Sequence, residues 1–132
     1  VYLYNRENDK FTQYLGDNSG ETLFGENIYK MCDYGDELVI GIHEGKLRKL
    51  NKRKNILTDV NAPEVHYKII RDVACFDDEL WVGTQSGVYV INELKNKISH
   101  IYNDPMCSYS LSDNQIIGTE KTVYGSGLIW GE

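Results

Sequence analysis

The sequence predicts an all-β protein made of β-propeller blades, each of them a four-stranded antiparallel sheet. The first observation is an internal repeat: residues 38–41 (LVIG) recur as 80–83 (LWVG) and as 128–131 (LIWG), with glycines 42 and 48 residues apart. The second is that each repeat contains four short apolar or alternating runs separated by turns rich in Gly, Asn, Asp or Lys, a pattern typical of strands. Four strands at this period indicate a propeller blade.

A second landmark keeps the same register. Residues 1–5 (VYLYN), 47–51 (LRKLN) and 88–92 (VYVIN) end in asparagines that lie 46 and 41 residues apart. Six residues after each asparagine stands an apolar residue, and three residues further stands another. These pairs are Phe11 with Tyr14, Leu57 with Val60, and Ile98 with Ile101. The agreement of independent landmarks indicates a true repeat.

The repeat places the strands, lettered a to d, in order along the chain. We expect a half blade of strands c and d at 1–15, whole blades at 27–60 and 69–102, and a half blade of strands a and b at 114–132. In the first whole blade, strand a covers 28–33, strand b 37–42, strand c 46–51 and strand d 56–60. The glycine after each strand b lets the backbone bend or pack closely. Trp81 and Trp130 are interpreted as aromatic packing between blades, with sugar stacking as the alternative.

The strand count amounts to about three blades, whereas a closed propeller typically has about four to eight. We therefore expect the chain to be a fragment of a larger propeller, either mature or cut from something longer, with open edges that pair with another sheet. The expected partners are flanking propeller repeats or a second copy of the chain, since the terminal half blades are complementary.

Composition and charge favour an ordinary globular domain without nucleic-acid or membrane partners. The 132 residues are 41% hydrophobic and 26% charged, with a formal net charge of −6 that repels phosphate backbones and anionic membrane surfaces. The basic stretch 46–54 alternates with apolar residues and is interpreted as a solvated strand face rather than a phosphate site. No stretch approaches the roughly 18 apolar residues of a membrane span, so we expect no membrane contact by this segment.

The three cysteines match no zinc-ligand spacing. Cys32 and Cys75 lie one residue out of register on adjacent a strands, so we expect buried, unpaired thiols rather than a disulfide. Cys107 lies in a loop and is expected to be the exposed one. The cysteine count leaves the redox compartment open.

No motif in the sequence indicates catalysis, a metal or a cofactor. The best acidic cluster, 77–79 (DDE), falls in the turn between strands a and b, where a turn role is favoured over calcium or general-acid chemistry. His43, His66 and His100 have no mutual spacing suited to a metal site. We therefore expect no catalytic residues, no metal, no cofactor and no enzymatic activity in this segment.

Several segments carry a family resemblance that spans nearly the whole chain. Residues 103–105 (NDP), 110–114 (SLSDN), 80–84 (LWVGT) and 87–89 (GVY) resemble the two-component regulator propeller repeat, as does 1–14. The resemblance implies a periplasmic sensor region of a hybrid two-component histidine kinase, which senses oligosaccharides and regulates polysaccharide-utilisation genes. Three departures stand out: 38–41 lacks the Trp of the motif, 124–127 (YGSG) replaces an Asp-rich turn, and Glu132 stands where Thr is preferred.

Binding residues are expected in the loops. In a propeller the d-to-a and b-to-c connections share one face, and their aromatic, amide and charged side chains suit the apolar face and hydroxyls of a sugar. The candidate ligand-binding residues are Glu44, His66, Tyr67, Arg71, Gln85 and Tyr109. For any one of them an ordinary polar loop role is the alternative. For the whole segment the alternative is a protein-interaction scaffold without a small-molecule ligand.

Overall fold

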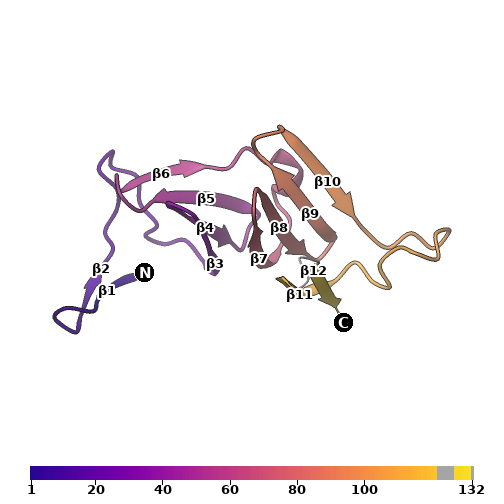
Figure 1. The fold of residues 1–132 in the computed structure, drawn as a ribbon, viewed down its shortest axis with the longest axis horizontal. Coiled ribbons are helices and arrows are strands. Elements are labelled where there is room, and N and C mark those ends of the chain that lie inside the picture. Colours follow the sequence, from indigo (N-terminus) through magenta and orange to yellow (C-terminus); the bar gives the residue numbers. More distant parts are fainter. Residues whose placement is uncertain (122–126, 132) are drawn as a thin grey trace.

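The fold was obtained as a computed structural model that describes residues 1–121 and 127–131, with side chains described up to residue 119. The described residues form twelve strands and one short 3₁₀ helix (Figure 1). The elements are β1 (Tyr2–Asn5), β2 (Lys10–Gln13), β3 (Ile28–Tyr34), β4 (Glu37–Ile42), β5 (Lys46–Asn51), β6 (Ile56–Asp59), η1 (Pro63–Val65), β7 (Ile70–Phe76), β8 (Glu79–Thr84), β9 (Gly87–Asn92), β10 (Lys97–Ile101), β11 (Ile116–Lys121) and β12 (Gly127–Gly131).

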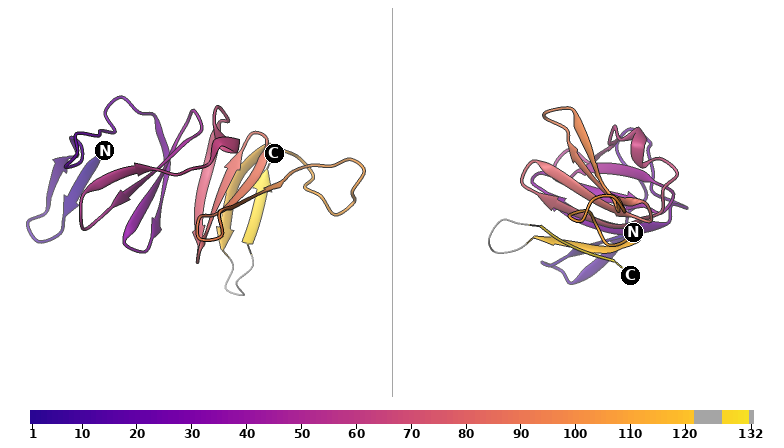
Figure 2. Two further views of the ribbon diagram at one scale, coloured as in Figure 1. Left: turned by 90° about the horizontal axis from the view of Figure 1, so that it is seen from above. Right: turned by 90° about the vertical axis from the view of Figure 1, so that its right-hand side faces the viewer.

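The strands form four antiparallel sheets, which confirms the predicted all-β fold class with four-stranded blades. Strands β3 to β6 form one four-stranded sheet and β7 to β10 another, each with its strands paired in chain order. Strands β1 and β2 pair as a hairpin, and so do β11 and β12. Figure 2 shows the sheets following one another in chain order, from indigo to yellow. The first strand of each sheet contacts that of the next, β3 with β7 and β7 with β11.

Apolar residues on both faces of β4 explain why the sheets stack. Val39 belongs to a core cluster between the two four-stranded sheets that also contains Val73 and Val82, all almost completely buried. Ile40 and Ile42 point to the opposite face and pack in a second cluster. A strand buried on both sides reads as a continuous apolar run rather than an alternating one, as residues 38–42 do.

The repeated glycines lie where the next sheet approaches most closely. A Cβ atom on Gly41 would lie 2.7 Å from Cγ2 of Val73 on β7. A Cβ atom on Gly83 would lie 2.7 Å from Cγ2 of Ile116 on β11. Both distances are shorter than van der Waals contact, so the repeat requires a residue without a side chain at this position.

Cys32 and Cys75 form a disulfide, so the prediction of unpaired thiols was wrong. Their Cα atoms are 6.1 Å apart, on β3 and β7. Cross-strand partners share a sheet face: Cys32 lies opposite Val39, which faces the second sheet, and Cys75 lies opposite Leu80, which faces the first. Thiols on two stacked sheets must point in opposite directions to meet. The one-residue offset therefore favours a bridge, because successive side chains alternate between faces.

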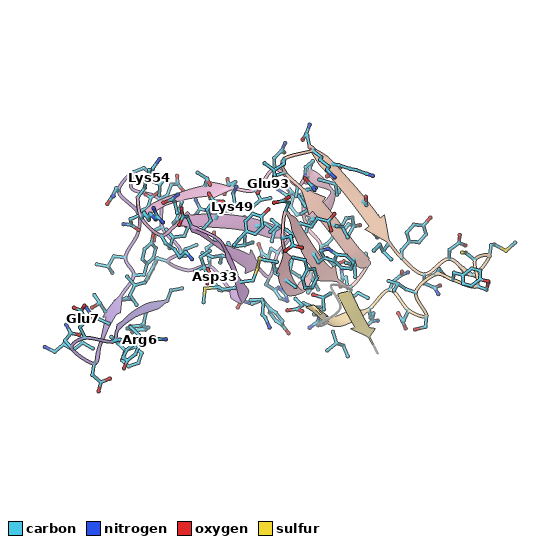
Figure 3. The ribbon with its side chains drawn as sticks, in the orientation of Figure 1. Arg6, Glu7, Asp33, Lys49, Lys54 and Glu93 are labelled. Atoms are coloured by element: carbon cyan, nitrogen blue, oxygen red, sulfur yellow. A yellow bond between two sulfur atoms is a disulfide. The ribbon has the colours of Figure 1, made fainter. Side chains whose placement is uncertain are left out.

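Two polar links also join neighbouring sheets. The buried carboxylate of Asp72 on β7 accepts hydrogen bonds from the backbone N–H (2.7 Å) and hydroxyl (3.1 Å) of Thr119 on β11. Its other oxygen lies 3.4 Å from the ammonium of Lys30 on β3. At a second place between the two four-stranded sheets, the Lys49 ammonium of β5 lies 3.0 Å from Glu93, the residue after β9 (Figure 3). Charge pairs as well as apolar contacts therefore hold the sheets together.

Trp81 lies half-buried on the face of β8 that also carries Gly83, and so on the side toward β11. Its ring meets Phe76 edge-on at 5.4 Å between centroids, and its indole N–H donates to Glu79 at 3.1 Å. The packing role inferred for Trp130 stays a prediction, since that side chain lies outside the described ones. The 124–127 turn begins outside the described residues, and Glu132 also lies outside them.

Candidate functional site

A bulge recurs near the start of the first strand in three successive sheets. The pairing register shifts between Ile28 and Lys30, between Ile70 and Asp72, and between Ile116 and Gly118. A bulge adds an unpaired residue and re-aims its side chain, which is why bulges are common beside functional sites. The added residues are Tyr29, Arg71 and Ile117, and all three are exposed. Equivalent positions on adjacent strands thus present a tyrosine, an arginine and an isoleucine at one end of the sheets.

These side chains line a cavity of about 270 Å³. The guanidinium of Arg71 lies 3.5 Å from the Tyr29 hydroxyl, across the boundary between the two four-stranded sheets. The ring of Tyr29 lies 6.0 Å from that of His43. The complete lining consists of Tyr29, Arg71, Gln85, Gln115, Ile116 and Ile117. The cavity therefore combines aromatic, cationic, amide and aliphatic groups from three sheets.

Gln85 is held in the tight turn between β8 and β9. The buried hydroxyl of Thr84 donates to the carbonyl of Gly87 and accepts from the N–H of Ser86, both at 2.9 Å. Gly87 has a φ of +100°, a conformation that glycine adopts without strain. The turn is therefore fixed by its own hydrogen bonds, and these fix the position of the Gln85 backbone.

Gln115 lies at the end of the loop that leads from β10 to β11. Asn103 holds the base of this loop with two hydrogen bonds of 2.6 Å. Its backbone N–H donates to the side-chain oxygen of Asn114, and its side-chain amide donates to the Leu111 carbonyl. The Ser110 hydroxyl donates to the Asp104 carbonyl at 2.9 Å. The NDP and SLSDN segments thus fix the loop and position the residue that follows them.

The six candidate residues from the sequence fall into two groups. Arg71 and Gln85 line the cavity, and Glu44, His66, Tyr67 and Tyr109 do not. Tyr67 is 91% exposed, and the centroid of its ring lies 5.9 Å from that of His66. Tyr109 is 98% exposed in the 102–115 loop. Glu44 occupies the exposed turn between β4 and β5. As ligand-binding residues all six stay predictions.

The sequence does not predict Tyr29 or the lining residues of the 115–117 segment as binding residues. Binding residues are expected in the loops, whereas these residues lie in or beside strands. The repeat itself contained the signal. Residues 28–41 align without a gap on 70–83, so Tyr29 occupies the position of Arg71. Ile116 and Ile117 repeat the same two positions at the start of β11.

The charges at the cavity differ from those at a larger hollow of about 440 Å³, which is lined by Lys49 and Glu93 among others. Burial by itself would lower the pKa of Lys49, but hydrogen bonds and opposite charge from Glu93 and then Glu37 raise it above 10.5. That cation is already neutralised. Arg71 is the one charged residue that lines the cavity beside Tyr29, and it forms no ion pair with any described side chain.

Within the described residues, no group of three or more His, Cys, Asp or Glu side chains is arranged to hold a metal ion. In the same residues no helix is long and apolar enough to cross a membrane. The arrangement at the cavity offers hydrogen-bond donors, acceptors and apolar surface, which are the means of binding a polar ligand.

Comparison with known proteins found no matching family model and no match among curated proteins. Solved structures do match, among them two crystal structures of the extracellular domain of BT4673 from B. thetaiotaomicron, described in one as a one-component system and in the other as a hybrid two-component system. The TM-scores are 0.77 and 0.74, both at 22% identity, over 98% and 97% of this chain. The chain spans 17% of the length of each of those structures. It therefore shares the fold of one segment of that extracellular domain.

Proposed function

We propose that this chain is part of the extracytoplasmic, periplasmic sensor region of a hybrid two-component signalling protein, and that its cavity beside Tyr29 binds an oligosaccharide. The observation that carries the binding proposal is the cavity lined by Tyr29, Arg71 and Gln85 from three adjoining segments. The fold shared with an extracellular domain supports the sensor role. The proposed role of this segment is binding and not catalysis.

The Cys32–Cys75 disulfide supports an extracytoplasmic location independently of the fold. Disulfides form and persist in oxidising compartments such as the bacterial periplasm, and they are rare in the reducing cytosol. This bridge joins two stacked sheets and is part of the framework that carries the cavity.

The lining residues support a sugar as the ligand. The Tyr29 ring and the two isoleucines offer flat and apolar surface for the C–H face of a sugar ring. The amides of Gln85 and Gln115 offer both donors and acceptors, which match hydroxyl groups that also do both. A few polar groups on an apolar background are typical of small-ligand sites.

Signalling would follow from the position of the cavity across sheet boundaries. Its lining comes from β3, from β7 with the β8–β9 turn, and from β11 with the residue before it. A ligand that contacts all three favours the arrangement in which they lie closest together, and it shifts the population toward that state. Regulation of polysaccharide-utilisation genes would be the output of this shift in the complete protein.

Calorimetric titration with a library of neutral and acidic oligosaccharides tests the proposal. Tyr29→Ala should weaken binding by about twofold to tenfold, because an aromatic contact contributes about 0.5–1.5 kcal/mol beyond its area. Tyr2→Ala is the matched control, since Tyr2 is 65% exposed on β1 and outside the cavity. Absence of binding across the library, or equal effects of the two variants, would contradict the proposal.

A protein-interaction scaffold remains the second candidate because the 102–115 loop projects from the sheets (Figure 2) and exposes large apolar side chains. Met106 is 94% exposed and Tyr109 98% exposed. This alternative predicts a stoichiometric polypeptide partner that the double variant Met106→Ser/Tyr109→Ser no longer binds. Such a result, together with silence in the sugar titrations, would favour the scaffold.

A further inference from the structure

The cavity contains a cation that no described group of the protein neutralises. Other arginines are ion-paired: Arg48 lies 2.8 Å from Glu21, and Arg53 lies 3.0 Å from Asp36. The guanidinium of Arg71 instead lies 3.5 Å from the Tyr29 hydroxyl, at the edge of hydrogen-bond distance. The guanidinium therefore keeps most of its five N–H donors available to a ligand.

The acid next to Arg71 in the chain is engaged with other groups. Asp72, its neighbour in the chain, is buried and directed at Thr119, with Lys30 at its second oxygen. No carboxylate is among the residues that line the cavity. The local charge is positive although the whole chain has a formal charge of −6.

We propose that the ligand of this cavity is an acidic oligosaccharide, whose carboxylate or sulfate group binds the Arg71 guanidinium. This inference rests on the proposed function and names the ligand class of the same site. A guanidinium is planar and presents paired N–H groups that match two oxygens of one anionic group. The Tyr29 hydroxyl lies beside it and can donate a further hydrogen bond.

The other residues that line the cavity restrict which sugar can carry the anionic group. Gln85 and Gln115 offer amides to ring hydroxyls, while Ile116 and Ile117 offer an apolar surface. The volume of about 270 Å³ is just below the roughly 300–1,000 Å³ of common ligand pockets. The cavity thus suits one acidic sugar unit, with the rest of the oligosaccharide extending outside it.

The test compares each acidic probe with its neutral counterpart by calorimetry, using the full chain. The probes are oligogalacturonides, the same oligosaccharides after carboxyl reduction, and sulfated oligosaccharides with their desulfated forms. We expect tighter binding of an acidic probe than of its counterpart. Arg71→Gln should weaken acidic binding about tenfold or more and neutral binding much less, because a hydrogen bond to a charged group is worth more than a neutral one.

Two variants control for charge and folding. Arg6→Gln removes the same charge from the exposed β1–β2 turn, far from the cavity, and should leave acidic binding unchanged (Figure 3). Arg71→Lys keeps the charge without the planar fork and should retain part of the affinity. The uronide and sulfate arms show which anion is preferred.

The outcomes separate this inference from the proposed function. Binding of neutral oligosaccharides with no preference for acidic ones would overturn the inference and leave the proposed function standing. Equal effects of Arg71→Gln and Arg6→Gln on acidic binding would also overturn it. Absence of binding by every probe, neutral and acidic, would overturn the proposed function and the inference with it.

Discussion

The substitution Asp72→Ala tests whether a single buried carboxylate couples three sheets. Asp72 on β7 accepts two hydrogen bonds from Thr119 on β11 and faces Lys30 on β3. Asp72 and Thr119 are both buried, at 5% and 7% exposure, so water cannot readily replace the lost acceptor. The substitution therefore leaves the Thr119 donors unsatisfied at the junction between two sheets.

The expected loss follows from these contacts. Each hydrogen bond to a charged group contributes about 1.5–3 kcal/mol, and the contact with the half-exposed Lys30 adds about 0–1 kcal/mol. Removing the carboxylate also removes the cost of burying it, so the net effect falls below the sum. We expect Asp72→Ala to destabilise the chain by about 2–4 kcal/mol. Asp72→Asn keeps one acceptor oxygen and should lose about half as much.

Urea unfolding followed by tryptophan fluorescence and circular dichroism measures this loss. With a slope of about 2 kcal/mol per molar urea, the midpoint should fall by about 1–2 M for Asp72→Ala. The matched control is Asp33→Ala, which removes a carboxylate that is 78% exposed and paired with Lys52. A surface pair of this kind contributes less than about 1 kcal/mol. If Asp72→Ala lowered the midpoint no more than Asp33→Ala, the coupling argument would be refuted.

Three further predictions concern the disulfide, an acid-sensitive carboxylate and a repeat glycine. Reduction of Cys32–Cys75, which are 43 residues apart, should lower stability by about 2–4 kcal/mol, and the Cys32→Ser/Cys75→Ser double variant should not respond to reductant in a thermal melt. Burial would raise the pKa of Asp17, but hydrogen bonds from a backbone N–H, a hydroxyl and two more N–H groups lower it from 3.8 to about 2. The ionised Asp17 therefore stabilises the fold fully above about pH 4, and this contribution is lost as the pH falls toward 2. In urea titrations, the difference in free energy of unfolding between wild type and Asp17→Asn should vanish over that window. A difference unchanged at about pH 2 would contradict this. Gly41→Ala places a Cβ 2.7 Å from Val73 and should cost about 1–3 kcal/mol by thermal unfolding, whereas an unchanged midpoint would show that the sheets have room there.

The strands could be predicted because their signal is local. The runs expected at 37–42 and 46–51 coincide with β4 and β5, since residues in them alternate or are continuously apolar and glycine or asparagine turns follow. The repeat added register, because Gly41 and Gly83 must occupy equivalent places where the next sheet approaches. Periodicity of this kind needs no knowledge of which sheet lies beside which.

Only some of the residues that line the cavity could be predicted from the sequence. The sequence predicts Arg71 and Gln85 as binding residues because they lie in or near connecting loops, and both line the cavity. Tyr29 was not selected, because a strand residue is expected to follow the regular alternation of faces and a bulge cannot be recognised from one sequence. Its equivalence to Arg71 in the repeat was visible, but the direction of both side chains was not.

The sequence by itself determined the all-β class, the repeat length and the residues that each strand contains, because these depend on neighbours along the chain. The tertiary structure decided which faces meet. Cys32 and Cys75 pair because stacked sheets bring opposite faces together, and Arg71 meets Tyr29 because two bulges turn them into one cavity. Contacts between residues more than forty positions apart depend on sheet stacking and local irregularities, which periodicity alone does not encode.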